Sequence, residues 1–150
     1  MIVLDANILI RAVLGLRVRR LLETYAAHGI LFYTPDAAFD DAEKYLPPLL
    51  SKRHISGADL PATFHYLQQF VETVDRDVYG NFENDAKARL QGRDEEDWPV
   101  LASALALNCP LWTEDTDFFG TGIAVWTTSR IEIFLKAQTI SMRGEDASNP

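Results

Sequence analysis

The sequence is short of cysteine, of basic charge and of long apolar runs, and each shortage excludes a class of protein. Its one cysteine, Cys109, cannot form a disulfide within the chain and has no second cysteine or nearby histidine pair with which to bind zinc. No apolar run approaches the roughly 20 residues that a membrane span needs, and the N-terminus lacks the features of a signal peptide. We therefore expect a cytoplasmic protein that does not enter a membrane.

Basic residues are outnumbered by acidic ones. The chain has 14 Lys and Arg against 22 Asp and Glu, which gives a net charge of −8. This sign is wrong for a protein that holds a polyanion through its overall charge, so such a partner would need a local basic patch or metal ions. The densest basic run is Arg17-Val18-Arg19-Arg20, with Arg11 nearby, and a solvated helix face is the alternative explanation for it.

Strand-like and helix-like segments alternate along the 150 residues. Short apolar runs predict strands at Ile2–Leu4, Ile30–Tyr33, Val71–Val74, Pro110–Thr113 and Ile123–Thr127. Apolar residues at helical spacing predict helices at about residues 6–14, 18–28, 36–50, 61–71, 84–90, 98–107 and 131–137, the third bent or ended by Pro47-Pro48. The alternation predicts an α/β fold with a mainly parallel sheet and helices on both faces. We expect one domain at residues 1–137 and a flexible tail at residues 138–150.

Carboxylates follow two of the predicted strands and precede one helix. Asp5 follows the first strand, Asp115 and Asp117 follow the strand that ends at Thr113, and Asp97 precedes the helix that starts at Trp98. Each has a simple structural alternative, since Asp5 and Asp97 could cap helices and the other two could shape a turn. Carboxylates that converge at one sheet edge repel one another, however, and such a cluster needs a cation. Oxygen ligands without His or Cys suit Mg²⁺ or Mn²⁺ rather than zinc.

Four features together resemble the PIN-domain nucleases, especially the toxins of prokaryotic toxin-antitoxin pairs. They are LDANILIRA, an acid on the helix after the second strand, DWPVLASALAL and WTEDTDFF, and the resemblance covers roughly residues 1–137. It implies a three-layer α/β/α fold with about five parallel strands, and Mg²⁺- or Mn²⁺-dependent cleavage of RNA. By position, the metal-binding acids match Asp5, Asp97 and Asp115, the acid before the family's Phe matches Asp117, and supporting polar residues match Asn7 and Thr113.

The second acid departs from the family pattern, which usually has Glu. This sequence has FDDAEKYL, in which Asp41 has the apolar flanks Ala42 and Leu46 expected of an acid at the rim of a buried face. Glu43 has the expected residue type but is followed by Lys44. We expect Asp41 to be the metal ligand and to act in catalysis with the other four acids, with Glu43 and then Asp40 as the alternatives.

The resemblance implies a metal-dependent endoribonuclease. We expect single-stranded RNA as its substrate, because splayed bases can approach a shallow site, with Arg11 or the Arg17–Arg20 run against the RNA backbone. It also implies a cognate antitoxin as a partner. The apolar residues of the helix at Leu60–Val71 could form a homodimer contact or pack in the core. Two other classes of protein are alternatives. A phosphotransfer or receiver domain would carry a second Asp two residues after Asp5 and a Lys after a later strand, which this sequence lacks. A non-catalytic binding module with the PIN fold stays open, because a fold does not establish an activity.

Overall fold

Five short parallel strands form the central sheet, in the order β3-β2-β1-β4-β5. They are β1 (Ile2–Leu4), β2 (Phe32–Pro35), β3 (Val71–Val74), β4 (Leu111–Trp112) and β5 (Val125–Trp126). The structure is a computed structural model that describes residues 1–57 and 59–148. All three residues of β1, the central strand, are fully buried, which agrees with a continuous apolar run that is covered on both faces.

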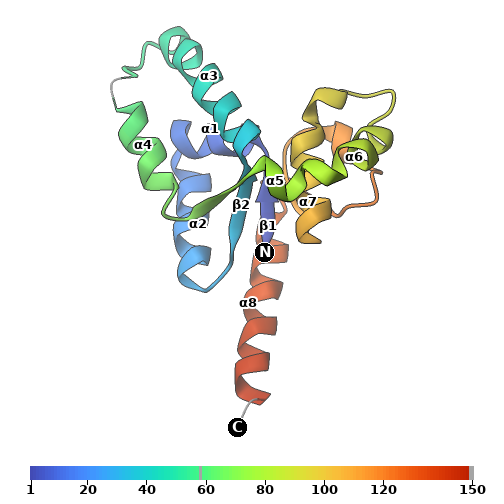
Figure 1. Cartoon of the computed structure of the whole chain (residues 1–150). Coiled ribbons are helices and arrows are strands. Elements are labelled where there is room, and N and C mark those ends of the chain that lie inside the picture. Colours follow the sequence, from blue (N-terminus) through green and yellow to red (C-terminus); the bar gives the residue numbers. More distant parts are fainter. Residues whose placement is uncertain (58, 149–150) are drawn as a thin grey trace.

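Helices cover both faces of the sheet (Figure 1). They are α1 (Ala6–Leu14), α2 (Leu16–Ala27), α3 (Asp36–Lys52), α4 (Leu60–Leu67), α5 (Arg76–Tyr79), α6 (Glu83–Arg89), α7 (Trp98–Leu107) and α8 (Ile131–Ser148). Short 3₁₀ turns lie at Gly80–Phe82, Glu95–Asp97 and Thr116–Phe118. The predicted three-layer α/β/α fold with five parallel strands is therefore confirmed.

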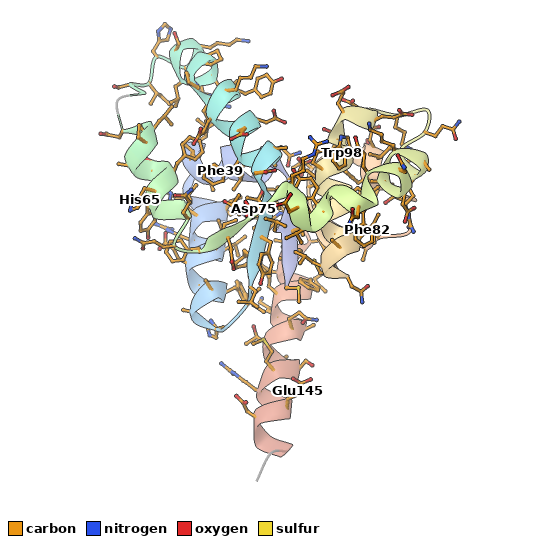
Figure 2. All side chains as sticks on the ribbon, viewed as in Figure 1. Phe39, His65, Asp75, Phe82, Trp98 and Glu145 are labelled. Carbon is orange, nitrogen blue, oxygen red and sulfur yellow. The ribbon has the colours of Figure 1, made fainter. Side chains whose placement is uncertain are left out.

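Alternate side chains of the strands face two separate cores. Ile2, Leu4 and Trp112 pack in the core of α1, α2, α3, α4 and the start of α8. Val3 and Leu111 pack in the core of α5, α6 and α7. Aromatic pairs stabilise each layer, with Phe39 of α3 against Phe64 of α4 and Tyr79 of α5 against Trp98 of α7, at ring-centroid distances of 5.2 and 5.6 Å. Figure 2 shows Phe39 and Trp98 in these two separate layers.

The structure differs from the sequence prediction at two helices. Helix α3 continues through Pro47 and Pro48 to Lys52 instead of ending there. The two prolines withhold hydrogen bonds from the carbonyls of Glu43 and Lys44, and because these residues are exposed, water can satisfy those carbonyls.

Helix α8 runs to Ser148, through most of the segment that the sequence predicts to be a flexible tail. Its last turns extend beyond the other helices (Figure 1), whereas Met142 still packs against the core that contains α1 and α2. Among the residues described, no helix is both long and apolar enough to cross a membrane. Cys109 is buried as expected, and burial raises the pKa of its thiol to about 11.

Candidate metal centre

A cleft of about 210 Å³ lies at the carboxyl ends of β1 and β4, and we call it the acid cleft. Its other walls are the first turns of α3 and α7. The residues that line it are Asp5, Ala6, Asn7, Ala37, Ala38, Asp41, Tyr45, Glu96, Asp97, Pro99, Val100 and Asp115. Five of these described lining residues carry a carboxylate and none is basic. The cleft therefore concentrates negative charge without a compensating cationic side chain.

Asp5 is the most firmly held of these acids. It is only 7% exposed, and its carboxylate accepts hydrogen bonds from the backbone N–H of Ala6 (2.7 Å), from Asn7 Nδ2 (3.2 Å) and from Thr113 Oγ1 (2.7 Å). The first of these bonds caps α1, so the helix-capping role and the position in the cleft coexist. Burial raises the pKa of Asp5, as do the charges of Asp115 and Asp41, against the lowering effect of the bonds from Thr113 and Ala6.

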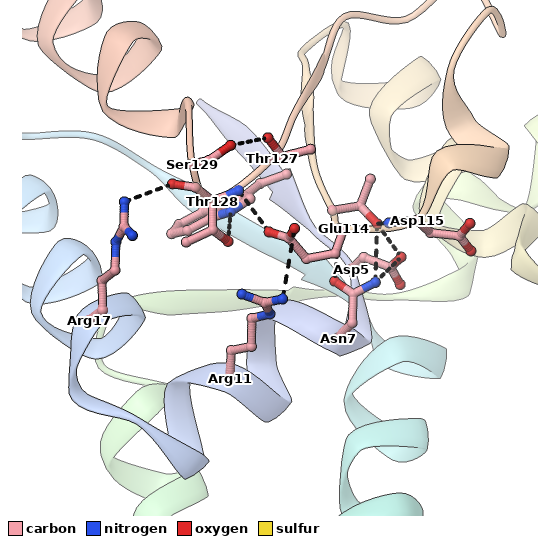
Figure 3. Close-up of polar contacts among 11 residues, drawn as sticks. Asp5, Asn7, Arg11, Arg17, Glu114, Asp115, Thr127, Thr128 and Ser129 are labelled. Carbon is pink, nitrogen blue, oxygen red and sulfur yellow. Dashed lines mark hydrogen bonds and ion pairs between the residues drawn. The ribbon is translucent and has the colours of Figure 1, made fainter.

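Asn7 and Thr113 connect Asp5 to the loop that follows β4 (Figure 3). Asn7 Nδ2 also donates to Thr113 Oγ1 at 3.2 Å, and the backbone N–H of Asp115 donates to the same hydroxyl at 3.0 Å. One threonine hydroxyl therefore sets the positions of two cleft acids. Both residues occupy the supporting places that the resemblance implies for them, although their role in a reaction remains a prediction.

Asp97 occupies the N-cap position of α7, but its side chain accepts no capping hydrogen bond there. It lines the cleft instead. Burial is the main cause that raises the pKa of Asp97 to about 7, followed by the charges of Asp5, Asp94 and Asp115 and a hydrogen bond with Asp115. A carboxyl group with this pKa holds a proton at neutral pH about half of the time. A nearby cation would lower this pKa and favour the ionised carboxylate.

Asp41 lines the cleft, whereas Asp40 and Glu43 do not. Residues two apart on a helix point about 200° apart, so Asp41 and Glu43 could not both face one site. Burial raises the pKa of Asp41 even though the residue is exposed, and the charge of Lys44 opposes this effect. The position of Asp41 is the one expected from its apolar flanks, but its role as a ligand remains a prediction.

Asp117 does not line the cleft. It lies in the 3₁₀ turn after Asp115, whose Oδ1 accepts a hydrogen bond from the Asp117 backbone N–H at 2.9 Å. Asp115 therefore shapes this turn and also faces the cleft. A catalytic role for Asp117 remains a prediction that its position does not explain.

Two acids with important contacts are not evident from the sequence motifs. Glu96 lines the cleft directly before Asp97, and the DEED run is the signal that could have identified it. Asp36 follows β2 at the same sheet edge, but it accepts hydrogen bonds from the Tyr79 hydroxyl and from the Arg76 N–H (3.3 Å) and joins α3 to α5. Burial and this bond to Asp36 raise the pKa of the Tyr79 hydroxyl. An acid after a strand therefore need not face the cleft.

Two arginines hold the loop after Asp115 through its backbone. Arg93 donates to the carbonyl oxygens of Asp117 and Phe119, and Arg89 Nη1 donates to that of Thr121 at 2.8 Å. Gly122 lies beside this contact with a φ of 88°, and a Cβ there would lie 2.7 Å from Arg89 Nη1. The backbone conformation at position 122 therefore favours glycine, and a side chain there would displace the end of the Arg89 side chain.

The donor chemistry of the cleft fits a hard divalent cation. Its acids are carboxylates without histidine or cysteine, the ligand set that Mg²⁺ and Mn²⁺ prefer. The raised pKa values of Asp5 and Asp97 indicate a cluster that a cation would stabilise. Within residues 1–57 and 59–148, no three acids, histidines or cysteines are already grouped closely enough to hold an ion. The fit therefore lies in charge and ligand type.

Comparisons with known proteins agree with this architecture. A family model described as PIN domain matches residues 3–136. The crystal structure of VapBC2 from Rickettsia felis bound to a DNA fragment from their promoter aligns with a TM-score of 0.62 at 16% identity, covering 85% of this chain and 98% of that one. No curated protein sequence matches the chain. At this identity the structural likeness shows a shared fold.

Proposed function

The chain belongs to the PIN domain family, as its motifs predict, and from this premise we propose that it is a Mg²⁺- or Mn²⁺-dependent ribonuclease. The observation that carries the proposal is the acid cleft, whose described lining includes five residues with a carboxylate and no basic residue. Such a cluster is costly to the folded protein, as the raised pKa of Asp97 indicates. A site that binds a cation and then an anionic phosphate accounts for that cost.

Asp5, Asp41, Asp97 and Asp115 are the residues that would hold the metal. When bound, a divalent cation offsets the charge of a phosphodiester and lowers the pKa of an attacking water. Asn7 and Thr113 keep the Asp5 carboxylate in one orientation through their hydrogen bonds to Oδ2. Small side chains at Ala37 and Ala38 leave the wall of the cleft open to a polymer backbone.

Single-stranded RNA is the proposed substrate. The cleft combines buried Asp5 at its base with exposed Asp41, Tyr45 and Glu96 at its rim, so it is an open site rather than a deep pocket. An unpaired strand can bring one phosphate to such a site, whereas a duplex is stiffer and keeps its bases stacked inside. The exposed ring of Tyr45 offers a surface on which an unpaired base can stack.

The direct test is cleavage of a mixed pool of single-stranded RNA by the purified protein with Mg²⁺, with Mn²⁺ or with chelator. We expect cleavage only with metal, and a loss of about 100-fold or more in Asp5→Asn, because the variant retains the shape of the site but removes a ligand charge. Asp36→Asn is the matched control, since Asp36 follows β2 as Asp5 follows β1 but contacts α5 instead of the cleft.

Metal binding separates the two ways in which this test could fail. Titration calorimetry should show that wild type binds Mn²⁺ more tightly than Asp5→Asn does. Metal binding without cleavage would favour the alternative, a PIN-fold binding module that does not turn over RNA. Equal binding of metal by both proteins would contradict the proposed site altogether.

We also propose that the chain acts as the toxin of a toxin-antitoxin pair and forms a homodimer. The support is the resemblance of its motifs to the toxin nucleases, together with the fold that it shares with VapBC2. Induced expression should arrest growth, while Asp5→Asn should not. Rescue by the product of an adjacent gene, and co-purification with it, would identify the antitoxin, and light scattering of the purified chain would measure its oligomeric state.

A further inference from the structure

A second cavity, of about 470 Å³, is larger than the acid cleft and has the opposite charge. We call it the arginine pocket. Its lining residues come from the α1–α2 junction, the end of α3, the loop after β4 and the loop before α8, and they are Arg11, Leu14, Gly15, Arg17, Val18, Arg53, Glu114, Thr128 and Ser129. Three guanidinium groups therefore face one carboxylate, in a protein whose net charge is −8.

The three arginines are still able to bind an anion. Arg17 donates one hydrogen bond, from Nη2 to the carbonyl oxygen of Thr128 at 3.3 Å (Figure 3). Arg11 lies 3.8 Å from the Glu114 carboxylate, a solvent-exposed ion pair of small energetic value. Within the described residues, the side chain of Arg53 has no ion-pair partner. Most of their donors therefore remain available to a ligand.

The arginine pocket is joined to the acid cleft by a short chain of hydrogen bonds (Figure 3). Asn7, which contacts Asp5 in the cleft, accepts a bond from the Glu114 backbone N–H at 3.3 Å. The Glu114 carboxylate faces the pocket, where it accepts a bond from the Thr128 N–H at 2.7 Å. Asn7 and Arg11 are four residues apart on α1, so their backbone positions lie about one helical turn, or roughly 6 Å, apart along the helix.

We propose that the arginine pocket binds a backbone phosphate of the same RNA strand that enters the acid cleft, next to the phosphate that is cleaved. The inference rests on the proposed ribonuclease function and adds a second point of attachment to it. A guanidinium group can donate two parallel hydrogen bonds to two oxygens of one phosphate, and the pocket contains three guanidinium groups. The pocket supplies the local basic patch that an acidic protein needs in order to hold RNA.

An acidic peptide is the rival ligand, and two observations favour RNA. Helix α1 contributes residues to both sites, and the Glu114 backbone N–H bonds to Asn7 of the acid cleft, so a ligand that fills both must present anionic groups close together, as successive phosphates do. The exposed acids Asp41 and Glu96 at the rim of the cleft would also repel an acidic peptide unless cations intervened. RNA, whose phosphates would enter the acid cleft together with metal ions, therefore fits the two sites better than an acidic peptide does.

The test is binding of a short labelled single-stranded RNA, measured by fluorescence anisotropy in the Asp5→Asn background with Mg²⁺. Arg53→Ala is the first variant, because its side chain forms no ion pair within the described residues, and Arg17→Ala is the second. We expect each to weaken binding about tenfold. Each should also lower the slope of log affinity against log salt by ~0.7 for every phosphate that the variant no longer neutralises. Arg143→Ala is the control, since Arg143 is exposed on α8 outside the pocket.

The outcomes separate this inference from the proposed function. If wild type cleaves RNA but the Arg53 and Arg17 variants bind it as Arg143→Ala does, the arginine pocket is refuted and the nuclease stands. If wild type does not cleave RNA but both variants weaken binding, the pocket is supported and the nuclease is not. If the variants lose affinity for poly-glutamate and keep it for RNA, the pocket belongs to a protein partner and our inference is wrong. Thermal melting of each variant checks that the fold is intact.

Discussion

The acid cleft and the arginine pocket both contain residues of α1, yet they hold their charges in opposite ways. In the cleft, Asp5 is buried and Asp97 half-buried, and burial raises the pKa of both. In the pocket, Arg11, Arg17 and Arg53 are all exposed. The carboxylates of the cleft therefore repel one another in a partly desolvated site, and a bound cation would relieve this repulsion. The arginines of the pocket are exposed, so water already stabilises their charges.

This difference indicates which site depends on the fold for its chemistry. Asp5 accepts three hydrogen bonds, two of which come from the Asn7 and Thr113 side chains. The arginines are long side chains that reach a shared space from separate helices. Substitutions should accordingly have sharp effects on rate in the cleft and graded effects on affinity in the pocket.

The largest expected effect tests which acid of α3 belongs to the cleft. Asp41→Asn should reduce Mg²⁺-dependent RNA cleavage by about 100-fold or more, because Asp41 is the α3 carboxylate that lines the cleft. Glu43→Gln, two residues along the helix, should remain within a few-fold of wild type. Initial rates on one labelled RNA measure both. The reverse result would assign the metal ligand to Glu43, and two active variants would remove α3 from the site.

A smaller loss of rate is expected when the support of Asp5 is removed but every carboxylate remains. Thr113→Val eliminates the hydroxyl that donates to Asp5 at 2.7 Å and accepts from the Asp115 N–H at 3.0 Å. Cleavage should fall by roughly 10–100-fold. The matched control is Thr127→Val, whose hydroxyl contacts that of Ser129 at 3.0 Å near the arginine pocket. A wild-type rate in Thr113→Val would show that Asp5 needs no such support.

The two sites should differ in what the removal of a charge does to stability. In chelator at pH 8, Asp97→Asn should raise the free energy of unfolding by ~1 kcal/mol, a value discounted for the partial exposure of the group. The same variant should lose metal-dependent cleavage. Arg53→Gln should leave stability within about 0.5 kcal/mol of wild type. Urea denaturation measures both, and an Asp97→Asn variant with unchanged stability and normal cleavage would identify Asp97 as a structural residue.

The smallest effect is a pH dependence in the metal-free protein. The pKa of Asp97 is raised from 3.8 to about 7 on folding, so the folded state binds more protons than the unfolded state between these values. The contribution of Asp97 to the free energy of unfolding is therefore most favourable below about pH 4, and it is lost as the pH rises toward 7. The stability difference between Asp97→Asn and wild type should widen over this interval in chelator and narrow when Mg²⁺ is added. A constant difference across pH would contradict the raised pKa.

Local patterns predict the elements and acids that belong to single segments. Helix α7 spans the predicted residues Trp98–Leu107, and Asp5 stands out because a charge directly after a buried strand is unusual. Asp41 is preferred to Glu43 because the apolar neighbours of a helix indicate its buried face. These inferences depend on residues close together in the sequence.

The arginine pocket could not be predicted in the same way. Arg53 reaches Arg11 and Arg17 because α3 packs on α1, and no periodicity in the sequence reports that contact. The course of α3 beyond Pro47 also depends on carbonyl groups that face water, which sequence rules for proline ignore. The direction of Asp97 depends on whether its helix starts at the cleft edge, and only the sheet topology decides that.

The contacts of Arg89 and Arg93 with the loop after Asp115 are made to carbonyl oxygens, which every amino acid possesses. The loop can therefore change its side chains at exposed positions such as Thr116 and Phe119 without releasing its anchors. Gly122 is the exception, because its φ of 88° is a backbone conformation that residues with a side chain rarely adopt. Evolution can thus vary the loop that follows Asp115 while the backbone bonds that hold this loop stay constant, and a library randomised at 116 and 119 should contain many variants that still fold.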